Sequence, residues 1–296
     1  MTDLVIRPLV AGEEDLFDSL PDPGLVGRAA FGETYRGGDY RPEWTWVALR
    51  DGVVVARAAW WAGPEDPAPL ALDWFDFTDA DAATELLRTA PFKVEYSLSL
   101  PHGWRDDPVV HAQGQARIDA AVAAGMRVLV ERFRYRWTPD CGLPDQPRRL
   151  EFRPEPDDVV IHDVLTRIAE GSLDAHTRRV AVEHGAAAAA KEDLDILLWL
   201  PSPRDWWRLA YTPGGDLVGI TVPARNYTDA IIGFVGVLPE HRGHGYAYDL
   251  LVEATHLLVA EGAAGIVAAT DQPNTPMAAT FARAGYPIER ERVDLV

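Results

Sequence analysis

The sequence contains a single cysteine, Cys141, among 296 residues. One cysteine excludes both an intrachain disulfide framework and a cysteine-based zinc cluster. The zinc-protease pattern His-Glu-x-x-His and the hydrolase pattern Gly-x-Ser-x-Gly are also absent from the sequence, so the usual signatures of those enzyme classes are missing. We expect a function that needs neither a disulfide nor a metal.

Positive charge is scarce. The chain has 28 Lys and Arg side chains against 46 Asp and Glu, for a net charge of −18. Such a field repels nucleic-acid phosphates and anionic lipids, so we expect neither nucleic acid nor a membrane as a partner. It attracts cationic small molecules such as amines, although an acidic surface can also serve solubility alone.

Long apolar stretches are missing as well. No uncharged apolar run approaches the roughly 18 residues needed to span a bilayer, and the first residues lack the basic and apolar regions of a signal peptide. We therefore expect a soluble, cytoplasmic protein that is a monomer or a homodimer. Its 47% apolar content is that of a globular protein, and its length suits two domains of about 150 residues each.

Three prolines and a glycine within residues 139–147 predict a linker between two similar halves. Residues 4–8 and 150–154 each suggest a short strand that ends in Arg-Pro. Near the other end of each half, a helical stretch stops at a glycine, Gly125 or Gly285, and a strand follows. These matches indicate a duplicated unit, with chance similarity as the alternative.

Each half also contains a hairpin signal. Arg50-Asp51-Gly52 separates two apolar stretches in the first half, and residues 212–216, with two adjacent glycines, do so in the second. The predicted element order implies an α/β fold in each half, with a mixed, mostly antiparallel sheet flanked by helices. We predict a first domain at 1–138, a linker at 139–148 and a second domain at 149–296.

The second half contains a loop suited to a phosphate. A nearly continuous apolar strand at 231–238 comes before the loop, and an amphipathic helix follows it. Two glycines let backbone amides approach a ligand, and the free N–H groups at the start of a helix favour an anion. An arginine adds positive charge. A tight strand-helix turn without a ligand is the alternative. The predicted diphosphate cradle consists of Arg242, Gly243, His244, Gly245, Tyr246 and Ala247.

With these elements in this order, residues 150–296 resemble the GNAT superfamily of N-acetyltransferases. The loop matches the family's acyl-CoA signature, Arg/Gln-x-x-Gly-x-Gly/Ala, at Arg242, Gly245 and Ala247. The same loop also begins a dinucleotide-binding fingerprint, but Tyr248 occupies the place of the third glycine that allows close helix–strand packing. We therefore discount a nucleotide-binding dehydrogenase.

The resemblance implies acetyl-CoA as the co-substrate and no metal. In the family, pantetheine lies in a splay beside the strand that precedes the loop, so main-chain groups around Val235 and Val237 are expected to hold it. The amides of residues 242–247 are expected to hold the pyrophosphate. Asn274 matches a position that commonly touches pantetheine or helps to set the splayed strand.

Acetyl transfer also requires proton movements. The departing thiolate benefits from a proton, which the family often supplies from a tyrosine four residues before the closing glycine. Phe281 stands at that position, so we expect it beside the cofactor but without a proton to donate. Water, a hydroxyl of Tyr227, Tyr248 or Tyr286, or no acid at all are the alternatives.

Asp229 is the predicted general base, because family members often place a carboxylate near the entry to the cofactor strand. A turn residue is the alternative. Asp174 and His176 lie in the helical region that usually shapes the acceptor pocket in the family. We expect direct, acetyl-CoA-dependent N-acetylation of a small cationic amine. The alternative, favoured by Phe281, is a non-catalytic acyl-CoA-binding or regulatory module.

The first half lacks the signature. Between the strand predicted at 70–77 and the helix at 82–89 stands Thr78-Asp79-Ala80-Asp81, and two carboxylates there would repel a phosphate. We predict a degenerate, non-catalytic copy of the second half, with an unrelated α/β domain as the alternative.

Overall fold

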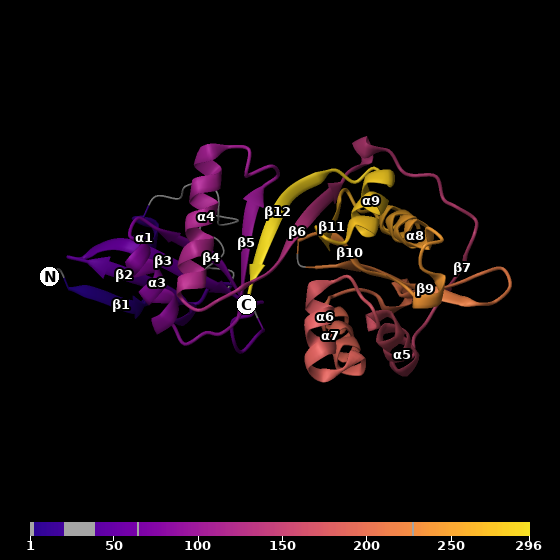
Figure 1. Ribbon diagram of the computed structural model, residues 1–296, viewed down its shortest axis with the longest axis horizontal. Helices are drawn as coiled ribbons and strands as arrows, with labels where there is room; N and C mark the ends of the chain where they lie inside the picture. Colours follow the sequence, from indigo (N-terminus) through magenta and orange to yellow (C-terminus); the bar gives the residue numbers. More distant parts are fainter. Residues whose placement is uncertain (1–2, 21–38, 64, 227) are drawn as a thin grey trace. The chain divides into compact units, whose positions relative to one another are not determined.

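A computed structural model describes residues 3–20, 39–63, 65–226 and 228–296 (Figure 1). The chain divides into two compact units. The first consists of Met1–Glu131 and Arg290–Val296, and the second of Arg132–Glu289. In each unit helices flank a mixed sheet, which confirms the predicted fold class.

The sheet of the second unit has the strand order β6-β11-β10-β9-β8-β7. The β10–β11 pair is parallel, and the other neighbours are antiparallel. The predicted hairpin at residues 212–216 is confirmed by the pairing of β8 with β9. The strands are β6 (Val128–Trp137), β7 (Glu151–Pro154), β8 (Arg208–Tyr211), β9 (Leu217–Arg225), β10 (Ala230–Val237) and β11 (Ile266–Asp271).

Helices cover both faces of this sheet. Helices α8 and α9 lie on one face, and α5, α6 and α7 lie on the other (Figure 1). Short 3-10 turns stand at η2 (Pro139–Cys141), η3 (Arg204–Trp206) and η4 (Pro239–His241). The helices are α5 (Asp158–Ala169), α6 (Ala175–His184), α7 (Ala186–Trp199), α8 (Tyr246–Ala260) and α9 (Thr275–Arg283).

The sheet of the first unit has the order β1-β2-β3-β4-β5-β12, and among its described strands only β4 and β5 are parallel. The predicted hairpin around Asp51 is confirmed, and Asp51 has a positive φ of 53°. The elements are β1 (Leu4–Pro8), α1 (Glu14–Asp18), η1 (Pro42–Trp44), β2 (Thr45–Arg50), β3 (Val53–Trp61), β4 (Ala71–Phe77), α3 (Ala80–Thr89), β5 (Glu95–Pro101), α4 (Pro108–Ala123) and β12 (Ile288–Leu295).

The last strand of each sheet comes from the other half of the sequence. Residues 132–137 of β6, which precede the predicted linker, pair with β11, and residues 290–295 of β12 pair with β5. Tyr135 and Trp137 accordingly lie in the core of the second unit, whereas Val293 and Leu295 lie in that of the first. The domain ranges predicted from the sequence, 1–138 and 149–296, differ at these segments: they assign residues 132–137 to the first domain and residues 290–295 to the second.

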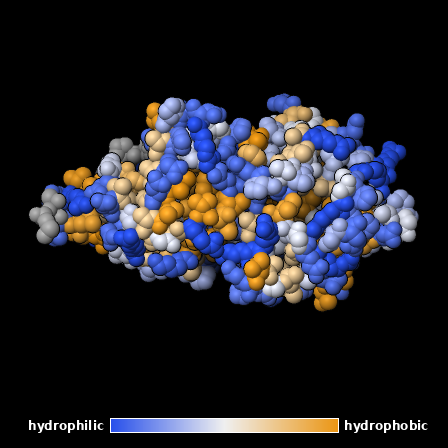
Figure 2. All heavy atoms as spheres, in the orientation of Figure 1, coloured by the Kyte–Doolittle hydropathy of each residue, from blue (hydrophilic) through white to orange (hydrophobic). Residues whose placement is uncertain are grey.

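The face drawn in Figure 2 is mostly hydrophilic over the second unit, with apolar residues showing over α6 and α7. Among the apolar side chains of α6 and α7, Val182 is 86% exposed and Ile196 is 55% exposed. Within the described residues, no helix combines the length and the apolar character that crossing a membrane requires.

Candidate functional site

Strands β10 and β11 separate after two residue pairs. Ala230 pairs with Ile266 and Ile231 pairs with Val267, and beyond them this edge of β10 is not paired with β11 in the described chain. A cavity of about 390 Å³ lies where the strands diverge, lined in part by Val235 of β10. The splay therefore leaves backbone groups of β10 available to an extended ligand, because an unpaired strand edge presents N–H and C=O groups.

The loop after β10 leaves the start of α8 open. Gly243 and Gly245 have positive φ angles of 82° and 74°, a region that glycine adopts without a Cβ penalty. No side chain caps α8. By contrast, α3, α4, α5, α6 and α9 each begin with an Asp or Asn whose side chain accepts a backbone N–H bond. The first amides of α8 thus remain able to bind an anion.

The guanidinium of Arg242 is directed away from these amides. Its Nε donates to the carbonyl of Val237 over 3.1 Å, and Nη2 donates to the carbonyl of Ile168 over 2.8 Å. Nη1 donates to the carbonyls of Glu170 and Gly171, both over 3.0 Å. Arg242 therefore ties the end of β10 to the end of α5, and the amides of residues 243–247 are left to form the cradle that the sequence predicts.

The other residues predicted at the cofactor lie along the splay. Asn274 caps α9 and, like Val235, lines the cavity. Phe281 also lines the cavity and is only 2% exposed. Its ring stacks on Tyr135 of β6, with centroids 4.3 Å apart and planes at 20°. The carbonyl of Val237 already accepts a bond from the arginine described above.

Two of the alternative tyrosine donors, Tyr248 and Tyr286, are not among the described residues that line the cavity. The hydroxyl of Tyr286 is 2.7 Å from Thr255 Oγ1 in the core, and burial raises its pKa. Tyr248 lies under the guanidinium of Arg283 at 3.7 Å, and Tyr227 is outside the described residues. Hydroxyls that do line the cavity belong to Ser172, Thr177 and Thr270.

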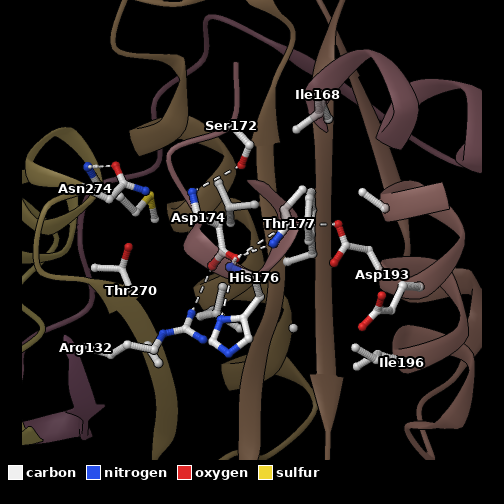
Figure 3. A pocket seen from close by; sticks show the side chains of 18 of the residues that line it. Arg132, Ile168, Ser172, Asp174, His176, Thr177, Asp193, Ile196, Thr270 and Asn274 are labelled. Atoms are coloured by element: carbon white, nitrogen blue, oxygen red, sulfur yellow. Dashed lines mark hydrogen bonds and ion pairs between the residues drawn. The ribbon is translucent and has the colours of Figure 1, made fainter. Parts of the chain in front are cut away.

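One side of the cavity is formed by charged groups of β6, α6 and α7 (Figure 3). The hydroxyl of Thr177 lies 3.4 Å from Asp174 Oδ1 and 3.4 Å from Asp193 Oδ2, so it bridges two carboxylates. Nη2 of Arg132 donates to Asp174 Oδ2 over 3.2 Å. Glu192 lines the same cavity. With three carboxylates against one arginine, this side favours a cationic ligand.

The two bridged carboxylates differ in acidity. Burial works to raise the pKa of Asp174, but Arg132 and the amides of Thr177 and His176 outweigh it and lower the pKa. Burial raises the pKa of Asp193 to about 7, and the nearby charge of Asp174 adds to the effect. A pair with divergent pKa values is typical of acid–base sites.

Asp229 lies apart from this group. Its Oδ1 is 3.0 Å from Nη1 of Arg136, its Oδ2 is 3.8 Å from Nη2 of Arg134, and it is not among the described residues that line the cavity. The amide of Asp229 donates to Asn226 Oδ1 over 2.7 Å, and its carbonyl accepts the amide of Asn226. This geometry suits a turn residue, and the base role of Asp229 stays a prediction.

Comparison with known proteins agrees with this geometry. Residues 177–286 match the family model described as "Acetyltransferase (GNAT) family". The second unit contains a GNAT acetyltransferase domain. No curated protein matches the sequence.

Solved structures show the GNAT fold over nearly the whole chain. A GCN5-related N-acetyltransferase from Sphaerobacter thermophilus is 15% identical with a TM-score of 0.55, covering 99% of this chain and 94% of that one. A tandem GNAT protein from the clavulanic acid biosynthesis pathway is 18% identical with a TM-score of 0.52, covering 99% and 98%. The tandem GNAT architecture is therefore confirmed, and an acyl-CoA-dependent N-acetyltransferase is the activity that the family supports.

In the first unit β4 and β5 also separate after two residue pairs, but a side chain bonds to the open edge of β4. In β10 the pairing with β9 shifts in register just before Phe234, and in β4 the pairing with β3 shifts just before Trp74. Phe75 therefore corresponds to Val235, since each is the second residue after the shift. The carbonyl of Phe75 accepts a bond from Nε of Arg117 over 3.0 Å, and Nη2 of Arg117 pairs with Asp76 over 2.6 Å. Arg117 is only 5% exposed. A buried arginine thus already occupies the strand carbonyl of Phe75, the residue that corresponds in position to Val235.

The loop of the first unit is occupied as well. Asp79 caps α3 by accepting the amide of Ala82 over 3.0 Å, and Nε of Arg50 lies 2.6 Å from its other oxygen. The amide and then the arginine lower the pKa of Asp79. Because a carboxylate already accepts an amide at the start of this helix, its negative charge would repel an external phosphate there.

Three residues at the candidate site were not predicted from the sequence. Asp193 stands in an acidic helical stretch, Glu192-Asp193-Leu194-Asp195, which is typical of a solvent-exposed face. Arg132 precedes the linker and comes to the cavity only because β6 pairs with β11. Arg149, which contacts the loop, follows the linker. No local pattern distinguishes these residues from surface charges.

Proposed function

We propose that this chain transfers the acetyl group of acetyl-CoA to the nitrogen of a small cationic amine. The splayed strands carry the proposal, because they join an anion-binding helix start at one end to a carboxylate-lined cavity at the other. Acetyl-CoA supplies an activated acyl group when it is bound. The cavity of about 390 Å³ suits a small acceptor.

The cofactor residues predicted from the sequence fit this arrangement. Main-chain groups around Val235 would hold the pantetheine arm along the open edge of β10, and Val237 could add only its amide because its carbonyl accepts a bond from Arg242. The amides of residues 243–247 would hold the diphosphate. A Cβ at Gly236 would lie 2.7 Å from Ile168, which lines the cavity. Glycine at this position therefore leaves Ile168 in place at the wall of the cavity. Asn274 and Phe281 would border the thioester end.

Asp193 is the base that the geometry favours. It lines the cavity, and its pKa of about 7 lets it take a proton from a protonated amine near neutral pH. Asp174 stays ionised beside it and attracts the cation. Asp229, predicted from its position in the sequence, is the second candidate for the base, although its arginine contacts engage both of its oxygens.

The reaction balances with these groups. The ammonium gives one proton to Asp193, and the free amine attacks the carbonyl carbon of the thioester. As the carbon–sulfur bond breaks, the nitrogen gives up its second proton to water. The products are an acetamide and coenzyme A, whose thiolate takes a proton from water because Phe281 offers none. A hydrogen-bond donor on the splayed strand would stabilise the developing oxyanion.

A panel of amines tests the proposal. Thiol release from acetyl-CoA should rise with small primary amines that carry a positive charge, and neutral or anionic amines of similar size should give little increase. Acetyl-CoA binding without acceptor-dependent thiol release would instead favour the non-catalytic acyl-CoA-binding module, which the phenylalanine at position 281 makes a specific alternative.

A glycine variant tests the cradle. Gly245→Val places a β-branched side chain at a φ of 74° and beside the amides that would bind the diphosphate, so CoA affinity should fall at least about 100-fold, or about 2.7 kcal/mol. Gly262→Val is the matched control, since Gly262 has a φ of 81° at the other end of α8. Calorimetric titration with CoA should show loss in the first variant only. Equal affinities in both would contradict the cradle.

A further inference from the structure

The start of α8 contains a buried negative charge. Asp249 lies in the first turn of this helix, and its side chain is 0% exposed. A carboxylate at this place offsets the partial positive charge that helps the helix start to attract an anion. The protein as a whole has a net charge of −18, so its overall field adds to the repulsion of a phosphate.

Arg149 contacts both this carboxylate and the loop. Its Nε donates to Asp249 Oδ1 over 3.0 Å, and Nη2 pairs with the other oxygen. Nη1 and Nη2 also donate to the carbonyls of His244 and Gly245, both over 3.1 Å. The guanidinium lies 5.1 Å from the ring centre of Tyr246. One side chain thus links the loop, the first residue of α8 and the buried charge.

Arg242, the arginine of the family signature, does not make these contacts with Asp249 and the loop carbonyls. The guanidinium of Arg242 binds the carbonyls of Val237 and Ile168 and of the turn after α5, away from the start of α8. Arg149 lies outside residues 177–286, which match the family, so that match assigns it no role. Its side chain is 47% exposed, which leaves one side of it open to solvent beside the loop.

We propose that Arg149 is the positioning residue of the diphosphate site. Its bonds to the two loop carbonyls hold the loop in the conformation that directs the amides of residues 243–247 outward. Its charge cancels that of Asp249, so the start of α8 accepts the diphosphate of an acyl-CoA. This inference rests on the proposed function, because it requires CoA to bind at this loop.

Titration calorimetry of the full chain tests the inference. Arg149→Met keeps a similar side-chain length and removes the charge, so the Kd for CoA should rise about tenfold or more, equivalent to about 1.4 kcal/mol. Affinity for pantetheine, which lacks the diphosphate, should stay unchanged. Asp249→Asn alone should have a small effect. The double variant Arg149→Met/Asp249→Asn should regain part of the lost CoA affinity, because no unpaired buried charge remains although the two bonds to the loop carbonyls are still missing.

Arg153→Met is the matched control. Arg153 also pairs with a carboxylate, Glu151 at 2.8 Å, and lies over an aromatic ring, that of Tyr211 at 4.5 Å, but it stands on β7. This variant should bind CoA like the original protein. Circular dichroism at the titration temperature selects the conditions in which every variant is folded.

The outcomes separate the two proposals. Original protein that binds CoA, with Arg149→Met binding equally well, would overturn the role of Arg149 alone. Equal losses for CoA and pantetheine, or no recovery in the double variant, would also overturn it, since the effect would then not act through the diphosphate or through Asp249. Absence of CoA binding in the original protein would overturn this inference together with the proposed function.

Discussion

Single residues in this protein take roles that their position along the chain does not show. Arg242 matches the acyl-CoA signature, yet its guanidinium bonds to carbonyls at the ends of α5 and β10. Asp193 stands in an acidic helical stretch, yet it lines the cavity and has a raised pKa. Both follow from packing: a guanidinium turns to the nearest unsatisfied helix-end carbonyls, and a carboxylate loses acidity where neighbours exclude water.

The first residue-scale prediction concerns the pH dependence of the reaction. The groups that shift the pKa of Asp193 are Asp174, which caps α6, Thr177 and His176 on α6, and Glu192 on its own helix. Because the base must be ionised, kcat/KM should rise with pH through about 7 and then level off. Asp193→Asn should lower kcat/KM at pH 8 about 100-fold and remove that rise. Rates with a cationic amine from pH 5.5 to 9 measure both effects.

The same variant has an opposite effect on stability. The folded-state pKa of Asp193 lies above its unfolded value, so folding stability is lost as pH rises toward about 7. Asp193→Asn should therefore raise the unfolding temperature at pH 8 and leave it nearly unchanged at pH 4. Asp195→Asn is the control, because Asp195 is exposed and paired with Lys191. If the rise of kcat/KM with pH persists in Asp193→Asn and disappears in Asp229→Asn, Asp229 is the base instead.

At the scale of elements, the decisive feature is the placement of β6 and β12. Six residue pairs join β6 to β11, from Ile266 with Trp137 to Asp271 with Arg132. Tyr135 and Trp137 are 2% and 1% exposed in the core of the second unit. Removal of either ring costs about 3–5 kcal/mol, whereas a whole domain is stable by only about 5–15 kcal/mol. The second unit therefore depends on a strand that precedes the linker.

Two fragments test this dependence. Residues 132–289 contain the strand that pairs with β11, so this fragment should unfold cooperatively on heating. Residues 149–296 lack it and leave the edge of β11 open, so this fragment should be unfolded or aggregated. Thermal unfolding followed by near-ultraviolet circular dichroism distinguishes them. A cooperative transition in the 149–296 fragment, equal to that of 132–289, would show that each half forms its own sheet.

At the scale of the whole molecule, two similar GNAT-like units are expected to hold one cofactor. The splay and loop of the second unit are open, whereas in the first unit Arg117 bonds to the carbonyl of Phe75 and Asp79 caps α3. These contacts support the hypothesis that the first unit is a degenerate copy. They are internal substitutes for the two groups, pantetheine and phosphate, that a ligand would otherwise supply.

Stoichiometry checks this hypothesis. Calorimetric titration of the full chain with CoA should give one site per chain. The heat of binding at that site should be lost in Gly245→Val, because the altered residue belongs to the second unit. Two sites per chain, or residual binding in the variant with a stoichiometry near one, would show that the first unit binds CoA as well.

The amino-acid sequence alone determined the local features. Alternation and apolar runs predicted β10 and β11, glycines and helix spacing located the loop before α8, and the matching ends of the halves indicated the tandem fold. These signals are short-range, since periodicity, turns and caps depend on neighbours along the chain. The hydroxyl missing at Phe281 was also visible there.

Only the tertiary structure decided which strand completes each sheet and which charges meet. The backbone bonds of a sheet edge accept any strand with a suitable alternation, and β6 and β12 both end their halves after a glycine and carry a Glu-Arg pair. Spacing therefore could not tell that β6 joins β11. For the same reason the contacts of Arg132, Arg149 and Asp193 were out of reach: each joins segments far apart in the chain, and such contacts form only when the whole chain packs.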